Sequence, residues 1–176
     1  AFQSGFAEAN MTGMAAGMAL CGLRPITYTI TAFNTIRCLE QIRLDVCYQN
    51  LPVIIIGVGG GLSYASLNAT HHALEDIAFL RVLPNMTVIC PGDAWEVRAA
   101  IRAAIKIDGP VYIRMAKKNE PLVHSSVPNF AIGKGKGINN LFLFIKIKSI
   151  CNISLKLKTS GPTHSMILVS TLFVIT

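Results

Sequence analysis

Two stretches of the chain are apolar to the point that no polar face remains. Residues Glu8 to Leu20 carry a single charge, that of Glu8, among alanine, glycine and methionine, so a helix there would be apolar almost all round. Such a helix belongs in a protein core or in an interface. The run from Pro52 to Val58 is continuously apolar, which is typical of a parallel strand buried on both faces.

Other elements follow from β-branched runs, helical spacing and capping residues. Thr35 is a candidate helix cap, and Asp93 with Glu96 resembles a capping box. The alternation of strands and helices allows only crossover connections, which predicts an α/β fold with a mostly parallel sheet and ligands at the carboxyl ends of its strands. Between the second strand and the next helix lies a loop rich in glycine, serine and asparagine, residues 59–70. The remaining predicted strands are Ile26–Thr31, Met86–Cys90 and Val111–Met115, and the remaining helices are Thr35–Gln49, His72–Leu83 and Asp93–Lys106.

Composition and charge narrow the class of protein. Hydrophobic residues make up 52% of the 176 residues and charged residues 14%, which suggests a surface partly covered by partner subunits. The net charge of +7 is concentrated in residues 121–176, which hold six lysines and no acid. These lysines lack an arginine-rich or aromatic-interleaved pattern, so we expect no nucleic-acid binding.

The cysteines and the hydropathy of the chain indicate in which cellular compartment the protein is expected. The five cysteines (Cys21, Cys38, Cys47, Cys90 and Cys151) are odd in number and form no C-x-x-C pair, which indicates reduced thiols that are mostly core residues. The first residues show no signal-peptide pattern. No apolar run reaches the roughly 18 residues that a spanning helix needs. We therefore expect a cytoplasmic protein without a membrane span.

Glu8 is the residue in this apolar helix that could carry chemistry. A carboxylate that leads a buried helix must be hydrogen-bonded, because low-dielectric surroundings disfavour its charge. It could offset the positive end of the helix dipole, or it could act as a working acid. The position of Glu8 alone leaves both interpretations open.

Several long motifs, in order, resemble one known family. GFAEANMTGMAAGMALCGLRP, LEQIRLDVCYQNLPV, GVGGGLSYASLNATHH, LRVLPNMTVICPGD and GPVYIRM are similar to the pyrimidine-binding domain of thiamine-diphosphate enzymes, and most of all to C-terminal subunits of transketolase-like proteins. The resemblance covers about residues 2 to 137. It implies a three-layer α/β sandwich whose first N-terminal elements are missing, with a partial domain at 1–125, a linker at 126–138, and a basic and apolar tail at 139–176 that has no assigned domain.

The resemblance also implies a cofactor and the residues that hold it. Glu8 matches the family's catalytic acid, which hydrogen-bonds the pyrimidine ring of thiamine diphosphate. Phe33 matches the aromatic that stacks on this ring, although by itself a Phe after a strand is more often a core residue. Arg37 is a weaker cofactor-binding candidate that could equally be a solvated helix charge. The diphosphate and its Mg²⁺ are held by a different domain in the family, so no metal ligand is expected in this chain.

Substrate contacts follow from two further positions. His71 matches the first histidine of the family's T-H-[HQ] motif, which reaches substrate hydroxyl groups, and a histidine can relay protons near neutral pH. From the residues alone, His71 could also have a structural role, or it could ligate zinc together with Glu75. Arg114 matches an arginine that faces a sugar phosphate, an anion that suits a guanidinium. The glycines from Gly57 to Gly61 match neither phosphate-binding fingerprint, which favours a tight loop that lines a site.

The resemblance as a whole implies a transketolase-like transferase that moves a two-carbon ketol unit between sugar phosphates. An N-terminal subunit would supply the diphosphate and Mg²⁺ site, giving a hetero-oligomer with self-association. Two departures bear on the sugar specificity: Gly59 and Leu67 stand where full-length transketolases have a histidine and an aspartate. The alternatives are a deoxyxylulose-phosphate synthase, a 2-oxoacid dehydrogenase β subunit, or a truncated, non-catalytic α/β binding module.

Overall fold

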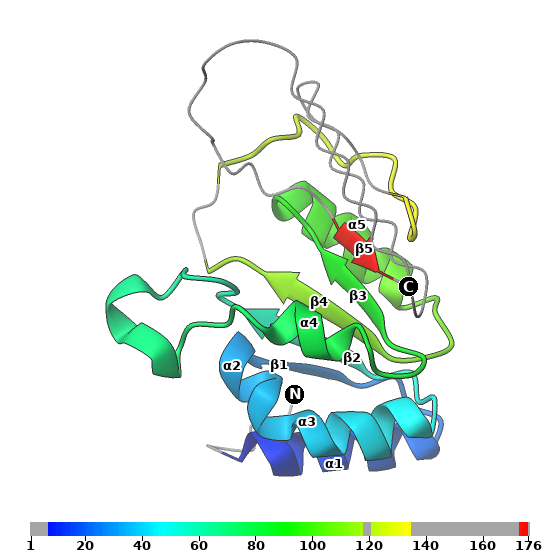
Figure 1. Cartoon of the computed structure of the whole chain (residues 1–176). Helices are drawn as coiled ribbons and strands as arrows, with labels where there is room; N and C mark the ends of the chain where they lie inside the picture. The colour runs from blue at the N-terminus through cyan, green and yellow to red at the C-terminus, as the bar shows by residue number, and fades with distance from the viewer. Residues whose placement is uncertain (1–6, 118–120, 135–172, 176) are drawn as a thin grey trace.

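A five-stranded sheet forms the centre of the molecule. A computed structural model describes residues 7–117, 121–134 and 173–175. The strand order is β1-β2-β4-β3-β5 (Figure 1). Strands β1 to β4 pair in parallel, which confirms the predicted α/β fold, and β5 pairs antiparallel to β3. The strands are β1 (Ile26–Ile30), β2 (Ile54–Val58), β3 (Thr87–Cys90), β4 (Val111–Met115) and β5 (Phe173–Ile175).

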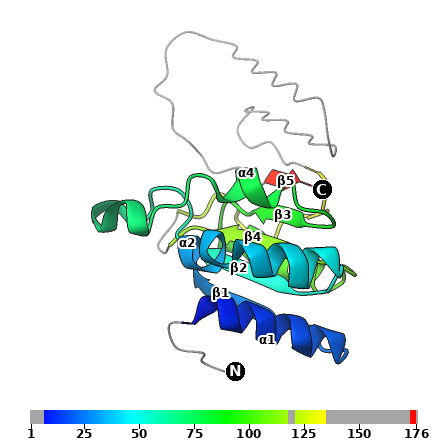
Figure 2. The ribbon, with the colours of Figure 1, turned by 60° about the horizontal axis from the view of Figure 1, so that its bottom comes forward.

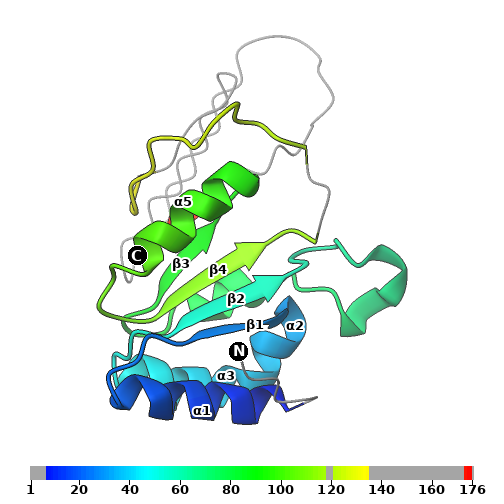
Figure 3. The ribbon, with the colours of Figure 1, turned by 180° about the vertical axis from the view of Figure 1, so that it is seen from behind.

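Alternating side chains of the sheet build one core on each face. Ile55 and Val88 belong to the core shared with the helices α1 (Glu8–Leu20), η2 (Ile42–Tyr48) and α4 (Asp76–Leu80). Ile54 and Ile56 belong to the other core, under α5 (Ala94–Ala104). Strand β2 is buried along its whole length, as its continuous apolar run predicted. Helices α4 and α5 cover opposite faces of the sheet (Figures 1 and 3), so the three-layer arrangement is confirmed.

Helix α1 has the predicted bounds and runs along the β1 side of the sheet (Figure 2). Ala15, Ala16 and Ala19 pack into the core. The small side chains of these alanines let the helix approach closely. On the other side of α1, Met14 is 46% and Leu20 is 70% exposed. One face of the helix therefore packs into the core, and the opposite face carries apolar side chains that no described residue buries.

The prediction of a single helix from Thr35 to Gln49 was wrong. The chain forms α2 (Thr31–Asn34), the 3₁₀ turn η1 (Ile36–Cys38), α3 (Leu39–Gln41) and the π-helix η2. The Thr35 hydroxyl donates to the Thr31 carbonyl at 2.6 Å rather than capping a helix, and the Asn34 amide donates to the Ile56 carbonyl at 2.9 Å. The first bond lies within the turn after β1, and the second ties this turn to strand β2. π-Helical turns are frequent at functional sites.

The helix predicted from His72 to Leu83 is shorter than expected. The 3₁₀ helix η3 (Ala65–Thr70) occupies the loop, and α4 begins at Asp76. Ala73 is held in the loop by its bridge to Gly61, and its carbonyl accepts a hydrogen bond from Arg114. These long-range contacts override the local helical pattern before Asp76.

Asp93 opens α5 as predicted and also fixes a later segment. Its side chain accepts from the Glu96 amide at 2.9 Å, and Glu96 Oε2 accepts from the Gly92 amide at 2.7 Å. The amides of Val123 and His124 donate to the second carboxylate oxygen of Asp93. Burial alone would raise the pKa of Asp93, but these hydrogen bonds lower it below its usual value. These bonds attach Val123 and His124 to the domain, and Phe130 and Ile132 of the expected linker pack against the core under α5.

The described cysteines are free thiols, and most are core residues as predicted. Cys38, Cys47 and Cys90 are buried and Cys21 is exposed, whereas Cys151 lies outside the described residues. Burial raises the pKa of Cys47 and of Cys90 to about 12, so both stay protonated and unreactive near neutral pH. Across residues 7–117 and 121–134 the structure contains no helix long and apolar enough to cross a membrane. Of the expected tail at 139–176, the described part is strand β5.

Candidate functional site

The carboxyl ends of β1, β2 and β4 carry the predicted site residues. Phe33 lies in the helical turn directly after β1, Arg114 lies in β4, and His71 follows the loop after β2. Glu8 reaches the same edge from the first turn of α1. This is the edge where parallel α/β sheets bind ligands.

Glu8 is buried and ion-paired. Its residue is 6% exposed, and its Oε2 accepts from Nη1 of Arg37 at 2.9 Å. Arg37 is about half exposed at the side chain, so the pair joins the interior to the surface. Glu8 stands in the first helical turn, where a carboxylate offsets the positive end of the helix dipole, and this position does not distinguish that role from a working one. Arg37 is a fixed partner of the carboxylate and not a freely solvated charge.

A row of rings and cations runs outward from this pair. The Arg37 guanidinium lies 4.2 Å from the centre of the Phe33 ring. The ring centres of Phe33 and His71 are 5.1 Å apart, and those of His71 and Tyr64 are 5.6 Å apart. Lys117 Nζ lies 4.6 Å from the Tyr64 ring centre. The fold thus brings Glu8, the neighbouring pair Phe33 and Arg37, and His71 together from three separate parts of the sequence.

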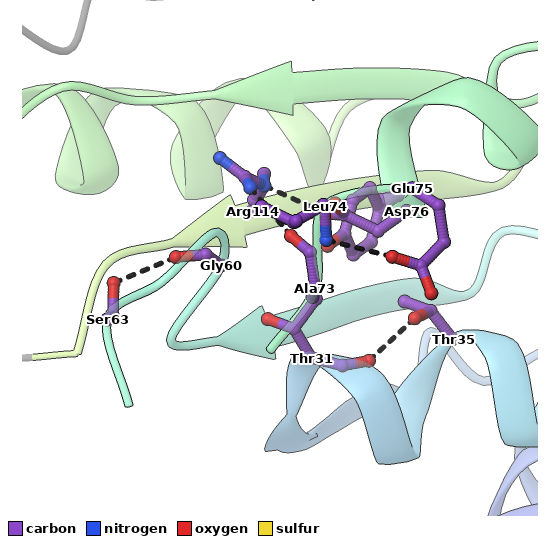
Figure 4. A network of polar contacts seen from close by, with 10 residues as sticks. Thr31, Thr35, Gly60, Ser63, Ala73, Leu74, Glu75, Asp76 and Arg114 are labelled. Atoms are coloured by element: carbon purple, nitrogen blue, oxygen red, sulfur yellow. Dashed lines mark hydrogen bonds and ion pairs between the residues drawn. The ribbon is translucent and has the colours of Figure 1, made fainter. Parts of the chain in front are cut away.

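Arg114 belongs to a second cluster, which faces the first core. Its Nε donates to Asp76 Oδ2 at 2.9 Å, and its Nη2 donates to the Ala73 carbonyl at 3.0 Å (Figure 4). The hydroxyl of Tyr112 donates to the same Asp76 oxygen at 2.6 Å. Burial, followed by the charge of Asp76, holds the pKa of Tyr112 well above its usual value, so the hydroxyl remains a donor. Arg114 therefore anchors the loop that carries His71, in addition to any substrate contact.

The turn Gly59–Tyr64 needs its glycines for close packing. Gly59 has φ +76°, and a methyl group added there would lie 2.0 Å from Cε2 of Tyr64. At Gly60 the nearest atom would be Nε of Arg114, at 2.6 Å. The predicted tight loop lining the site is thus packed against Tyr64 on one side and Arg114 on the other. Among residues 7–117 and 121–134, no group of three histidine, cysteine or acidic side chains could hold a metal ion.

Replacing Gly59 by alanine should destabilise the chain by about 1–3 kcal/mol, since the new methyl group displaces the Tyr64 ring and the positive φ is strained. The matched control is Gly61→Ala, where φ is also positive at +67° but the nearest atom, Nη2 of Arg114, would be 3.4 Å away. Urea denaturation of both variants separates the steric cost from the backbone cost. Equal losses at the two positions would contradict the packing of Tyr64 against Gly59.

Sequence reasoning missed several residues of the site. Tyr64 and Lys117 extend the row of rings, and Asp76 and Tyr112 hold Arg114. Tyr64 is the aromatic within the small-residue loop, which is a usable signal. Asp76 directly follows Glu75, and nothing in the local pattern distinguishes the buried acid from its exposed neighbour.

A parallel sheet with a buried carboxylate, an aromatic ring and a histidine aligned at its carboxyl edge defines a ligand-binding α/β domain. The chain belongs to the transketolase pyrimidine-binding domain family, whose model matches residues 1–121. The family predicted from the sequence is thus confirmed.

Three similar proteins illustrate the match. The chain is 39% identical over 134 residues to a 6-deoxy-6-sulfo-D-fructose transketolase subunit of Clostridium sp. (strain MSTE9), covering 76% of this chain and 42% of that protein. It is 35% identical over 163 residues to an apulose-4-phosphate transketolase subunit of Actinobacillus succinogenes, covering 89% and 52%. A solved split-gene transketolase, described as an inactive beta4 tetramer, superposes with a TM-score of 0.68 at 40% identity, covering 77% and 43%. The chain thus spans about half the length of these relatives, or less.

Proposed function

We propose that this chain is the pyrimidine-binding part of a thiamine-diphosphate-dependent, transketolase-like enzyme that transfers a two-carbon ketol unit between sugar phosphates. The observation that carries the proposal is the buried Glu8 carboxylate at the head of the row formed by Phe33 and His71. Both curated relatives described above are transketolase subunits named for sugars that bear an anionic group.

The residues present fit the pyrimidine end of thiamine diphosphate. A carboxyl group and an aromatic ring, bridged by Arg37, suit a flat heterocycle that needs one hydrogen-bond partner and one stacking surface. When bound, the cofactor supplies a nucleophilic carbon that adds to a substrate carbonyl. Glu8 would hydrogen-bond the ring nitrogen and hold a proton there, Phe33 would stack on the ring, and Arg37 would keep the Glu8 carboxylate oriented.

His71 and Arg114 are proposed to serve the substrate. His71 lies next to Phe33, which supports the proposal that it contacts hydroxyl groups of a sugar bound beside the pyrimidine and relays protons. Arg114 uses Nε and Nη2 within the fold, and its Nη1 is the nitrogen proposed to meet a sugar phosphate. Mg²⁺ and the diphosphate are assigned to a partner subunit.

The partner in this proposal is an N-terminal transketolase-like subunit that carries the diphosphate-binding domain, within a hetero-oligomer that also self-associates in the cytoplasm. The exposed apolar side chains of Met14 and Leu20 on α1, and of Ile26 and Tyr28 on β1, support a covered surface on this side of the molecule. In the proposed organisation, residues 1–125 form the partial domain, 126–138 the linker and 139–176 the tail.

Reconstitution tests the proposal directly. The full chain by itself, with thiamine diphosphate and Mg²⁺, should show negligible ketol transfer, because half of the cofactor site lies on the partner. Adding a chain that carries the G-D-G and downstream asparagine pattern of a diphosphate-binding domain should produce transfer that depends on both the cofactor and Mg²⁺. Steady-state turnover with each component omitted in turn provides the controls. Turnover by the chain without its partner contradicts the split site.

A further inference from the structure

The loop after β2 holds His71 by its ring and by its backbone. The centre of its ring lies 5.1 Å from that of Phe33 and 5.6 Å from that of Tyr64. Its amide donates to the carbonyl of Asn68 at 3.0 Å. Asn68 has φ 58° and ψ −161°, a conformation that residues other than glycine seldom adopt and that clusters at functional sites. The loop therefore fixes the imidazole beside Phe33, and its chemistry then depends on which ring nitrogen carries the proton.

The Thr70 hydroxyl contacts the ring of His71 and a carbonyl group at the same time. Thr70 Oγ1 lies 2.9 Å from Nδ1 of His71 and 3.2 Å from the carbonyl oxygen of Leu67. A carbonyl oxygen only accepts, so the single hydroxyl hydrogen is donated to Leu67, and the hydroxyl oxygen accepts from Nδ1–H. If the hydroxyl donated to Nδ1 instead, two oxygen atoms would face each other with no hydrogen between them. The contacts of Thr70 thus favour a neutral His71 with its hydrogen on Nδ1 and a lone pair on Nε2.

The neighbouring His72 shows the opposite arrangement. Its Nε2 lies 3.0 Å from the carbonyl oxygen of Ala65, so Nε2 carries the hydrogen of that bond. In the neutral ring, Nδ1 of His72 then has the lone pair. The 3₁₀ helix η3 supplies both partners, Ala65 and Thr70, so it holds two adjacent histidines in opposite tautomers.

We infer that Thr70 is a positioning residue for the proposed reaction: it holds neutral His71 in the Nδ1–H tautomer and so presents Nε2 to the substrate as an acceptor. A substrate hydroxyl can then donate a hydrogen bond to Nε2 or lose its proton to that atom. When the proton is transferred, the ring becomes cationic, the Nδ1–H bond to Thr70 is kept, and the same proton later returns from Nε2. The inference rests on the proposed function and deepens it, since it assigns the proton-accepting atom and the residue that selects it.

NMR of the full chain labelled with ¹⁵N tests the tautomers without any turnover. In alkaline buffer, where histidine rings are neutral, the ring nitrogen without a hydrogen resonates far downfield of the one that carries it. The wild type should show hydrogen on Nδ1 of His71 and on Nε2 of His72, each ring being identified by the loss of its signals in His71→Gln or His72→Gln. Thr70→Val should shift the tautomer ratio of His71 about three- to tenfold toward Nε2–H, the value of one hydrogen bond, and leave His72 unchanged.

Thr70→Ser and Ser66→Ala are the controls. Serine returns the hydroxyl, so Thr70→Ser should restore Nδ1–H at His71. Ser66→Ala removes an exposed hydroxyl of the same 3₁₀ helix and should change neither ring. A wild-type His71 with its hydrogen on Nε2 overturns the inference, and this spectrum decides the point even if Thr70→Val does not fold. A tautomer ratio that a folded Thr70→Val leaves unchanged overturns it as well.

Turnover of the reconstituted complex links the tautomer to the reaction. Thr70→Val should lower kcat/KM for ketol transfer about three- to tenfold, in step with the lost Nδ1–H population, and Thr70→Ser should recover it. A shift of the tautomer without a loss of rate overturns the positioning role. If the wild-type complex shows no cofactor-dependent transfer while the His71 tautomer depends on Thr70, the proposed function fails and the tautomer assignment stands.

Discussion

Glu8→Gln should reduce ketol transfer by the reconstituted enzyme about 10²- to 10⁴-fold, the range expected when a positioned acid–base group is lost. Glutamine keeps the shape of the side chain and can still hydrogen-bond a ring nitrogen, but it cannot hold and return a proton there. Cofactor affinity should therefore change only a few-fold, so kcat falls while the thiamine diphosphate Kd stays measurable. Calorimetric titration of cofactor into the complex gives the Kd, and initial rates give kcat.

A control variant separates the loss of catalysis in Glu8→Gln from a loss of folding. Arg37, which loses its charged partner in Glu8→Gln, is half exposed and can be solvated, so the fold should survive. Glu40→Gln is the control, since Glu40 is an exposed acid in α3 on the same side of the sheet. Its rate should match the wild type. Rates within tenfold of the wild type for Glu8→Gln would falsify the catalytic role, and the buried carboxylate would then be a helix-start acid held by Arg37.

Elements with a strong local pattern were predictable, and elements set by distant contacts were not. The bounds of α1 follow from its run of small apolar residues, and the cap of α5 follows from Asp93 and Glu96, which bond one another across a few residues. The split of the helix after β1 depends on the Asn34 amide reaching the Ile56 carbonyl, a bond between residues 22 positions apart. No local propensity encodes that partner, so the sequence predicted an uninterrupted helix.

The site residues also divide into those that a local pattern predicts and those that distant contacts determine. Glu8, Phe33 and His71 were found because each matches a family motif, and Arg37 was a weaker candidate one turn after Phe33. The fold then placed Glu8 in contact with this arginine, 29 positions away. Asp76 lies within 5 residues of His71 in the sequence, but its importance comes from Tyr112 and Arg114, 36 and 38 positions away. Burial and partners across the sheet decide whether an acid is structural, and both appear only in the folded chain.

Asp76→Ala should be the most destabilising single substitution at this edge of the sheet, lowering the free energy of unfolding by about 3–5 kcal/mol. Asp76 is 1% exposed, and its Oδ2 accepts from both the Tyr112 hydroxyl and Arg114 Nε. Without the carboxylate, a fully buried hydroxyl and a largely buried guanidinium lose their partner in low-dielectric surroundings. That loss is a large fraction of the 5–15 kcal/mol typical of a native domain.

Urea denaturation followed by circular dichroism measures this loss, and two further variants assign its cause. Asp108→Ala removes an aspartate that also pairs with an arginine, Arg24, at 3.1 Å, but its side chain is 97% exposed, so stability should barely change. Asp76→Asn keeps an oxygen that can accept from Tyr112 but removes the charge that pairs with Arg114, so it should fall between the wild type and Asp76→Ala. Because Arg114 also holds the Ala73 carbonyl, both Asp76 variants should loosen the loop that carries His71 and speed amide exchange in residues 59–75. A destabilisation of Asp76→Ala no larger than that of Asp108→Ala would show that the buried cluster does not hold this edge of the sheet together.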